Sequence, residues 1–158
     1  MPLPHEGRRP TKPHGCVTDG SKIILDLCGG TGAWGEPYRE HGYDGRLVTL
    51  PDQDVRTYTP PDHVYGILAA PPCTMFSLAR RRAKTPPDFE GAMDVVAACL
   101  RIIWRCRARG TLKFWALENP TGLLRQFLGI PHYTFQPWWF GAQHSKRTDL
   151  WGYFSAPT

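Results

Sequence analysis

The chain has 158 residues, of which 41% are hydrophobic and 21% charged, and a formal net charge of +5. This length and balance suit one globular domain, and no apolar run approaches the ~20 residues that a membrane-spanning helix needs. The N-terminus lacks the apolar core of a signal peptide, so we expect a cytoplasmic protein without a membrane partner. The basic charge favours a polyanionic partner such as nucleic acid, although many basic proteins bind none.

The N-terminal segment and the cysteines place few constraints on function. The five cysteines are scattered and form no Cys-x-x-Cys pair, so neither a disulfide framework nor a zinc ribbon is indicated. Residues 1–20 are rich in Pro, Gly, Arg and His, and we expect an irregular arm before one domain over residues 21–158. In that arm, His14 and Cys16 could bind a metal ion or lie in a solvated loop. No second ligand pair accompanies them, so we expect no metal site.

The hydrophobic pattern alternates between strands and helices along the chain. In order, it predicts a strand at 22–27, a helix at 33–41, strands at 46–50 and 64–70, a helix at 90–109, a strand at 112–117, a short helix at 122–128 and an aromatic, strand-like segment at 133–154. The apolar face of the long helix should comprise Met93, Val96, Ala97, Leu100, Ile103 and Trp104. This alternation predicts an α/β domain with a mostly parallel, twisted sheet and helices on both faces, whose ligands bind at the carboxyl ends of the strands.

A glycine-rich loop joins the first expected strand to the first expected helix. It runs Asp26-Leu27-Cys28-Gly29-Gly30-Thr31-Gly32, and its glycines would let the backbone adopt positive φ and approach a ligand closely. Such loops serve dinucleotides and S-adenosylmethionine, and they can also be only tight connections. The chain lacks Gly-x-x-x-x-Gly-Lys-Ser/Thr, which disfavours a phosphate-binding P-loop. Asp26 could accept hydrogen bonds from loop amides or from the amine of a ligand.

The segment Ala70-Pro71-Pro72-Cys73-Thr74-Met75-Phe76-Ser77 is the most specific motif, and it follows the third expected strand. Its two prolines fix two φ angles, so they end the strand and present Cys73 on a stiff turn. A thiol is a suitable nucleophile for C6 of a pyrimidine, and nearby cations would raise the thiolate fraction. Four cations follow closely, at Arg80, Arg81, Arg82 and Lys84. The alternative is a buried, inert cysteine beside a solvated basic segment.

Two further polar segments follow in the chain. Glu118-Asn119-Pro120 ends an apolar run, where a glutamate is costly unless it is paired or functional. A raised pKa would let Glu118 donate a proton to a ring nitrogen, whereas the alternative is a helix-capping or ion-paired glutamate. The segment Gln143 to Trp151 mixes basic and aromatic residues, so Arg147 could bind a carbonyl oxygen or a phosphate, or lie on a plain basic edge strand.

These motifs, taken in order, resemble those of the cytosine-C5 DNA methyltransferases. The matching patterns are Asp-Leu-x-Gly-Gly-x-Gly, Pro-Pro-Cys-x-x-Phe-Ser, Glu-Asn-Pro and Gln-x-x-x-Arg, which together extend over residues 22–151. The small size and the C-terminal Lys-Arg-Thr-Asp-Leu-Trp-Gly are similar to compact phage-type members. The resemblance implies a Rossmann-like methyltransferase fold, in a bacterial or phage-infected cell, acting on duplex or single-stranded DNA with base flipping from a duplex.

The resemblance also implies roles for individual residues. S-adenosylmethionine would be the cofactor, in a site formed by Asp26, Cys28, Gly29, Gly30, Gly32, Asp52, Asp54 and Pro71. Cys73 would attack C6 of cytosine, and Glu118 would stabilise and protonate N3. Asn119 would brace the Pro-Pro-Cys loop, and Arg147 would hold the O2 atom of the base or that loop. A mobile loop closing on DNA phosphates would carry Ser77, Arg80, Arg81, Arg82 and Lys84.

The chain also departs from the family pattern at several positions. Cys28 stands where the family usually has Phe, and Ser145 replaces the first arginine of Gln-x-Arg-x-Arg. Pro51 and Asp52 stand where an acidic residue normally ends the second strand, so Asp52 is a candidate for the ribose hydroxyls. The segments that would follow Thr158 in the family include the target-recognition domain, so we expect low specificity, or specificity supplied by a partner chain or a homodimer. The same chemistry on RNA or on a free cytidine nucleotide, and a non-catalytic nucleic-acid-binding module, remain as alternatives.

Overall fold

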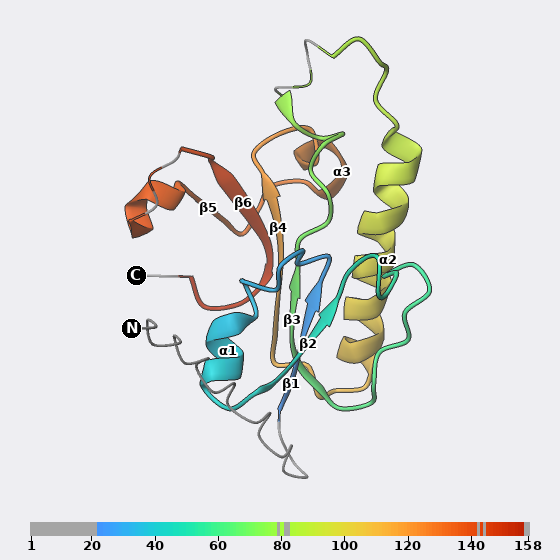
Figure 1. Ribbon diagram of the computed structural model, residues 1–158, viewed down its shortest axis with the longest axis vertical. Helices are drawn as coiled ribbons and strands as arrows, with labels where there is room; N and C mark the ends of the chain where they lie inside the picture. Colours follow the sequence, from blue (N-terminus) through green and yellow to red (C-terminus); the bar gives the residue numbers. More distant parts are fainter. Residues whose placement is uncertain (1–21, 79, 81–82, 142, 144, 157–158) are drawn as a thin grey trace, which may run out of the picture.

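Six strands form one mixed sheet in the computed structural model, which describes residues 22–78, 80, 83–141, 143 and 145–156 (Figure 1). The strands are β1 (Ile23–Leu27), β2 (Asp44–Val48), β3 (Val64–Ala69), β4 (Phe114–Pro120), β5 (Tyr133–Phe135) and β6 (Thr148–Tyr153). Their order across the sheet is β2-β1-β3-β4-β6-β5. The first four are parallel, whereas β6 is antiparallel to both of its neighbours. The predicted α/β class and largely parallel sheet are therefore confirmed, with an antiparallel hairpin added at one side.

The strand order reverses direction next to β1. From β1 the chain moves to β2 on one side, and it then crosses to β3 on the other side of β1. At such a switch point the connections leaving neighbouring strands diverge and open a crevice at the carboxyl ends. The glycine-rich loop leaves β1 at this point, and the Pro-Pro-Cys segment leaves β3 beside it. The topology thus brings together two of the motifs that the sequence singled out.

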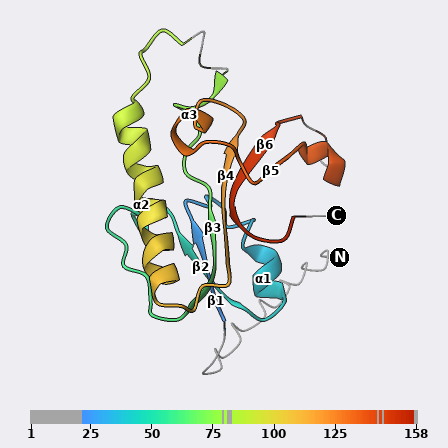
Figure 2. The same ribbon diagram turned by 180° about the vertical axis from the view of Figure 1, so that it is seen from behind.

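Two helices lie on opposite sides of the sheet in both views (Figures 1 and 2). The long helix α2 (Phe89–Ala108) begins at Asp88, whose side chain accepts a hydrogen bond from the Gly91 amide at 2.9 Å. It covers the main core, where its buried side chains are Val96, Ala98, Cys99, Ile102, Ile103 and Cys106. The predicted apolar face was partly wrong, because Ala97 is exposed and Trp104 is 69% exposed. Two cysteines act as small hydrophobes instead and rotate the buried stripe.

The remaining boundaries differ from the sequence prediction for local reasons. The helix expected at 33–41 is only α1 (Glu36–Glu40), because Pro37 opens it after a run of turns. The strand expected at 46–50 lies at Asp44–Val48, in register with β1 from Ile23 to Leu27. After β4 come the short helix α3 (Arg125–Leu128) and, beyond β5, the 3-10 turn η2 (Pro137–Phe140).

Strand β4 ends three residues later than predicted. It continues from Leu117 through Pro120, because β6 pairs with these residues and gives their backbone groups partners. Glu118 and Asn119 therefore lie on a strand and point to opposite faces of the sheet, since side chains alternate along a strand.

Within the described part of the chain, no helix has the length and apolar character that crossing a membrane requires.

Candidate active site

The glycine-rich loop folds into successive turns directly after β1. The backbone has positive φ at Cys28 (59°), Gly30 (57°) and Gly32 (75°), a region that glycine adopts readily and cysteine rarely does. The Cys28 amide donates to the Val48 carbonyl of β2 at 2.8 Å, which fixes the start of the loop. A Cβ at Gly30 would meet no atom within 4 Å, so one side of the loop is open. The loop therefore exposes backbone at the switch point, as a ligand-binding turn requires.

Asp26 lies beneath this loop and is almost fully buried. Its Oδ2 accepts a hydrogen bond from the Gly35 amide at 3.1 Å, whereas Oδ1 has no partner among the described residues. A Cβ at Gly29 would collide with this carboxylate, so only glycine lets the loop pass so close. Burial raises the pKa of Asp26, although the Gly35 hydrogen bond and the charge of Arg39 oppose the rise. The carboxylate therefore retains an unused acceptor next to the loop.

The Pro-Pro-Cys segment is attached at one point to the end of β4 and at a second to the turn that follows β4. Asn119 is fully buried, and its Nδ2 donates to the Pro71 carbonyl at 2.9 Å. The Leu123 amide donates to the Phe76 carbonyl at 2.8 Å, and a Cβ at Gly122 would collide with that carbonyl. Asn119 and Pro71 are 48 positions apart in the chain. Their contact fixes the Pro-Pro-Cys segment relative to Glu118, which precedes Asn119 on β4.

Cys73 lies at the turn of the Pro-Pro-Cys segment. Its side chain is partly buried, and its carbonyl accepts hydrogen bonds from the amides of Phe76 and Ser77, both at 3.0 Å. Neighbouring residues of the segment line three separate clefts, to which Ala70, Pro72 and Met75 each contribute. Cys73 itself is not among the residues that line these three clefts, and it is not part of the apolar core.

A cleft of about 430 Å³ opens between the glycine-rich loop and strands β4 and β6. We call it the Glu118 cleft, and its lining consists of Gly29, Ala33, Trp34, Ala70, Glu118, Phe135, Pro137, Lys146, Thr148 and Leu150. Its volume lies within the about 300–1,000 Å³ that is typical of small-molecule sites. Residues from all three sequence motifs, namely Gly29, Ala70 and Glu118, meet in this one space.

Glu118 is the acidic residue in the lining of this cleft. Burial raises the pKa of its carboxyl group, and the positive charge of Lys146 only partly offsets that rise. A carboxyl group with a raised pKa holds a proton at a higher pH, so it can act as a proton donor nearer neutrality. Arg147, the predicted base-binding residue, is exposed and does not line the Glu118 cleft, whereas its neighbour Lys146 does.

A second cleft, of about 150 Å³, lies on the other side of the Pro-Pro-Cys segment. We call it the Asp54 cleft, and it is lined by Cys28, Thr49, Leu50, Gln53, Asp54, Val55, Arg56, Pro72 and Val95. Hydrogen bonds from the Arg56 side chain and amide lower the pKa of Asp54 to about 2. Asp54 therefore stays ionised and accepts hydrogen bonds at physiological pH. Asp52 is exposed and lies outside this lining.

The predicted DNA-binding loop adjoins a third cleft, of about 350 Å³, whose lining includes Ser77, Arg80 and Lys84. Arg80 does not extend into solvent, because its guanidinium donates to the carbonyls of Thr85 and Pro86 at 3.1 and 3.0 Å. It therefore shapes the loop in this conformation. Arg81 and Arg82, like His14 and Cys16, lie outside the described residues.

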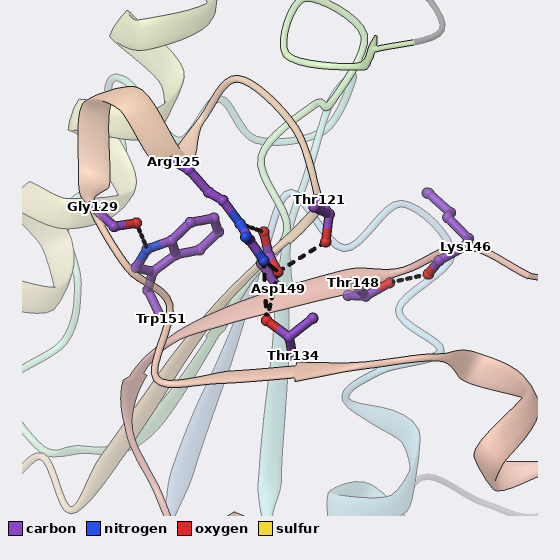
Figure 3. Close-up of polar contacts among 8 residues, drawn as sticks. All are labelled: Thr121, Arg125, Gly129, Thr134, Lys146, Thr148, Asp149 and Trp151. Carbon is purple, nitrogen blue, oxygen red and sulfur yellow. Dashed lines mark hydrogen bonds and ion pairs between the residues drawn. The ribbon is translucent and has the colours of Figure 1, made fainter.

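An ion pair that the sequence did not indicate joins the partly exposed Arg125 to a buried aspartate on β6 (Figure 3). Asp149 on β6 is fully buried and accepts two hydrogen bonds from Arg125, both at 2.6 Å. The hydroxyls of Thr121 and Thr134 donate to the same carboxylate at 2.9 and 2.8 Å. This cluster ties the residue after β4, helix α3 and strands β5 and β6 together around one carboxylate. A single aspartate in a basic segment gives no sequence signal for such a network.

Two aromatic lining residues, Trp34 and Phe135, were also missed. They come from distant segments, so only the fold shows that they share a cleft. The available signal in the sequence was a tryptophan just after a glycine-rich loop.

No model of a known protein family matches this chain, and no curated protein matches its sequence.

Proposed function

We propose that the chain is an S-adenosylmethionine-dependent methyltransferase with a Rossmann-like fold, which methylates cytosine at C5 in DNA. One observation carries the proposal: Gly29 from the glycine-rich loop, Ala70 from the Pro-Pro-Cys segment and Glu118 line a single cleft. These segments follow or end three parallel strands, and they meet at the topological switch point. Three motifs whose order along the chain resembles that of one enzyme family thus also line one cleft.

The residues around the glycine-rich loop fit the cofactor. The free Oδ1 of Asp26 supplies a buried acceptor for an ammonium group, and the open side of Gly30 leaves room against the backbone. In the Asp54 cleft, the ionised Asp54 could accept from an adenine amino group, while Val55 and Pro72 offer apolar contacts. When bound, S-adenosylmethionine supplies an electrophilic methyl group on a sulfonium.

The chain's own residues would carry the remaining chemistry. The thiolate of Cys73 forms a bond to C6 of cytosine, and the C5=C6 electron pair moves into the ring as Glu118 delivers a proton to N3. C5 then takes the methyl group. Solvent water next takes the C5 proton, the S–C6 bond breaks as the C5=C6 bond re-forms, and N3 returns its proton to Glu118. The products are 5-methylcytosine, the demethylated cofactor, whose sulfur is now a thioether, and one proton. Cys73 and Glu118 return to their starting states.

Asn119 and Lys146 would assist the reaction without forming bonds to the base. Asn119 donates to the Pro71 carbonyl, so it would hold the Cys73 turn at a fixed distance from Glu118 on the same strand. Lys146 in the cleft lining would offer a donor to the O2 atom of the base, a role that the family resemblance implies for Arg147. An effect of Lys146→Ala larger than that of Arg147→Ala on methyl transfer would support this exchange.

The test is a covalent adduct. Wild-type protein, S-adenosylmethionine and an oligonucleotide containing 5-fluorocytosine should give a protein–DNA species in a denaturing mass spectrum, because fluorine cannot leave C5 as a proton does. Cys73→Ala should give none and should lose methyl transfer, while it still binds the cofactor in calorimetry. Adduct formation by Cys73→Ala, or none by the wild type, would overturn the nucleophile assignment.

A substrate panel separates the alternatives. Transfer of labelled methyl groups should be compared on duplex DNA, single-stranded DNA, RNA and dCMP. We expect the label in DNA. Label in RNA or dCMP alone would move the same chemistry to another substrate, and label in none, with retained DNA binding, would indicate a non-catalytic binding module.

A further inference from the structure

Three adjacent aromatic side chains protrude from the turn that follows β5. Trp138 is 56% exposed, Trp139 52% and Phe140 59%, whereas the structural Trp151 is only 7% exposed. Single exposed hydrophobic residues are ordinary, but a contiguous group of large ones marks an interaction surface. We call Trp138, Trp139 and Phe140 the aromatic turn.

The turn has a defined shape. Pro137 opens the 3-10 turn η2, and Gly141 ends it in a left-handed conformation at φ 88°. The rings of Trp138 and Trp139 lie at 82° to each other, with centroids 6.0 Å apart, and the Phe140 ring packs edge-on against Phe135 at 5.7 Å. The two indoles therefore present differently oriented faces. Figure 1 shows η2 beyond β5, away from the layer formed by α2.

The aromatic turn adjoins the Glu118 cleft. Phe135 and Pro137, which precede the turn in the chain, both line that cleft, and the Phe135 ring packs against Phe140. Lys146 also lines the cleft, and Arg147, the next residue, is exposed, so positive charge lies at the same cleft. Aromatic faces and cations at the edge of one cleft match the chemistry that binds a single strand, in which bases stack and the backbone charge is neutralised.

We propose that the aromatic turn binds single-stranded DNA, by stacking unpaired bases next to the cytosine held in the Glu118 cleft. This inference rests on the proposed function, because it names the form of the substrate. Duplex bases are already stacked on each other, so they cannot offer their faces to Trp138 and Trp139 without opening the helix. The turn thus favours unpaired DNA, and on a duplex it would bind bases only where the helix has opened.

Binding of an oligo-dT of about 16 nucleotides tests the inference, a length within the site sizes of single-strand binding folds. Oligo-dT contains no cytosine, so the result does not depend on methyl transfer. The variants are the double substitutions Trp138→Ala with Trp139→Ala, and Trp138→Leu with Trp139→Leu. The leucine pair keeps apolar surface but removes the aromatic faces. Trp104→Ala is the matched control, because Trp104 is 69% exposed on α2.

We expect both double variants to raise the Kd for oligo-dT on the order of tenfold or more, while Trp104→Ala leaves it unchanged. Wild-type fluorescence should be quenched on binding, and the quenching should vanish in the double variants. An unchanged Kd, or wild-type affinity in the leucine pair, would overturn the inference. So would a loss of self-association without an effect on oligo-dT, which would make the turn a protein–protein surface.

The experiments distinguish failure of the methyltransferase proposal from failure of the single-strand binding proposal. If 5-fluorocytosine DNA gives an adduct but the double variants bind oligo-dT normally, the methyltransferase proposal stands and the aromatic turn has another role. If no substrate is methylated but the double variants lose oligo-dT binding, the aromatic turn stands as a single-strand binding surface and the methyltransferase proposal falls.

Discussion

Glu118 and Asp149 lie on paired strands at the same end of the sheet, in opposite electrostatic environments. Burial alone would raise the pKa of Asp149, but hydrogen bonds from Arg125, Thr134 and Thr121 outweigh it and hold the pKa below its usual value. Burial likewise raises the pKa of Glu118, and there the charge of Lys146 offsets only part of the rise. One carboxylate is stabilised as an anion, and the other is biased towards its protonated form.

The strand geometry explains how neighbours come to differ so much. In the β4–β6 pairing, Glu118 lies opposite Leu150 and Asn119 lies opposite Asp149. Paired residues point to the same face, so Glu118 and Leu150 face the open cleft, while Asn119 and Asp149 face the packed side. The packed side supplies donors that stabilise the fold. The cleft side leaves a carboxyl group short of donors, which costs stability and is typical of groups that take part in chemistry.

The largest expected effect comes from removing the titratable group in the cleft. Glu118→Gln keeps the shape of the side chain but cannot deliver a proton, so methyl transfer should fall by roughly 10²- to 10⁴-fold. The free energy of unfolding at neutral pH should stay the same or rise, because a partly buried carboxylate is replaced by a neutral amide. Methyl-transfer assays and urea unfolding measure the two effects.

The exposed Glu40→Gln on α1 is the control for Glu118→Gln, and it should change neither quantity. Wild-type turnover in Glu118→Gln would remove Glu118 from the chemistry. A strongly destabilised variant would instead make Glu118 a structural residue like Asp149.

The second effect is on stability, from the packed side. Asp149→Ala leaves Arg125, Thr121 and Thr134 without their shared acceptor, and it should lower the free energy of unfolding by about 3 kcal/mol. The melting temperature should fall by roughly 6–12 °C. Asp62→Ala is the control, since Asp62 is 79% exposed in its ion pair with Arg109, and it should cost less than about 1 kcal/mol. Equal losses in the two variants would contradict the contrast.

The sequence predicted the elements whose signals are local. The helix at 90–109 was recognisable from apolar spacing, and it is found at Phe89–Ala108. The end of β4 was not predictable, because Glu118 to Pro120 become a strand only by pairing with β6, some thirty residues later. The exposure of Trp104 was not predictable either. The apolar spacing predicts a core position for it, but the position of the sheet leaves its side chain exposed.

The candidate site divides in the same way. The glycine-rich loop, the Pro-Pro-Cys segment and Glu118 could be found from composition and order along the chain. Asp149 and Phe135 could not, because their roles depend on which of two faces each residue takes in the hairpin of β5 and β6. Lys146 could not either, because it lies in the irregular segment just before β6. A shift of one residue in the register of β6 would turn Asp149 to the cleft side, and the basic segment itself contains nothing that fixes this register.

The smallest effect is the pH dependence, and it tests the contrast most directly. The folded pKa of Asp149 lies below the ordinary 3.8, so its stabilisation is present above about pH 3.8 and is lost as pH falls through the folded value. The folded pKa of Glu118 lies above the ordinary 4.5, so its ionisation costs stability as pH rises through that higher value. Urea unfolding across this range should therefore show two opposite trends. The deficit of Asp149→Ala against wild type should shrink towards acid, and the advantage of Glu118→Gln should grow above about pH 4.5. Parallel profiles for the two variants would mean that both carboxyl groups share one environment, and the assignment of Glu118 as the proton donor would lose its electrostatic basis.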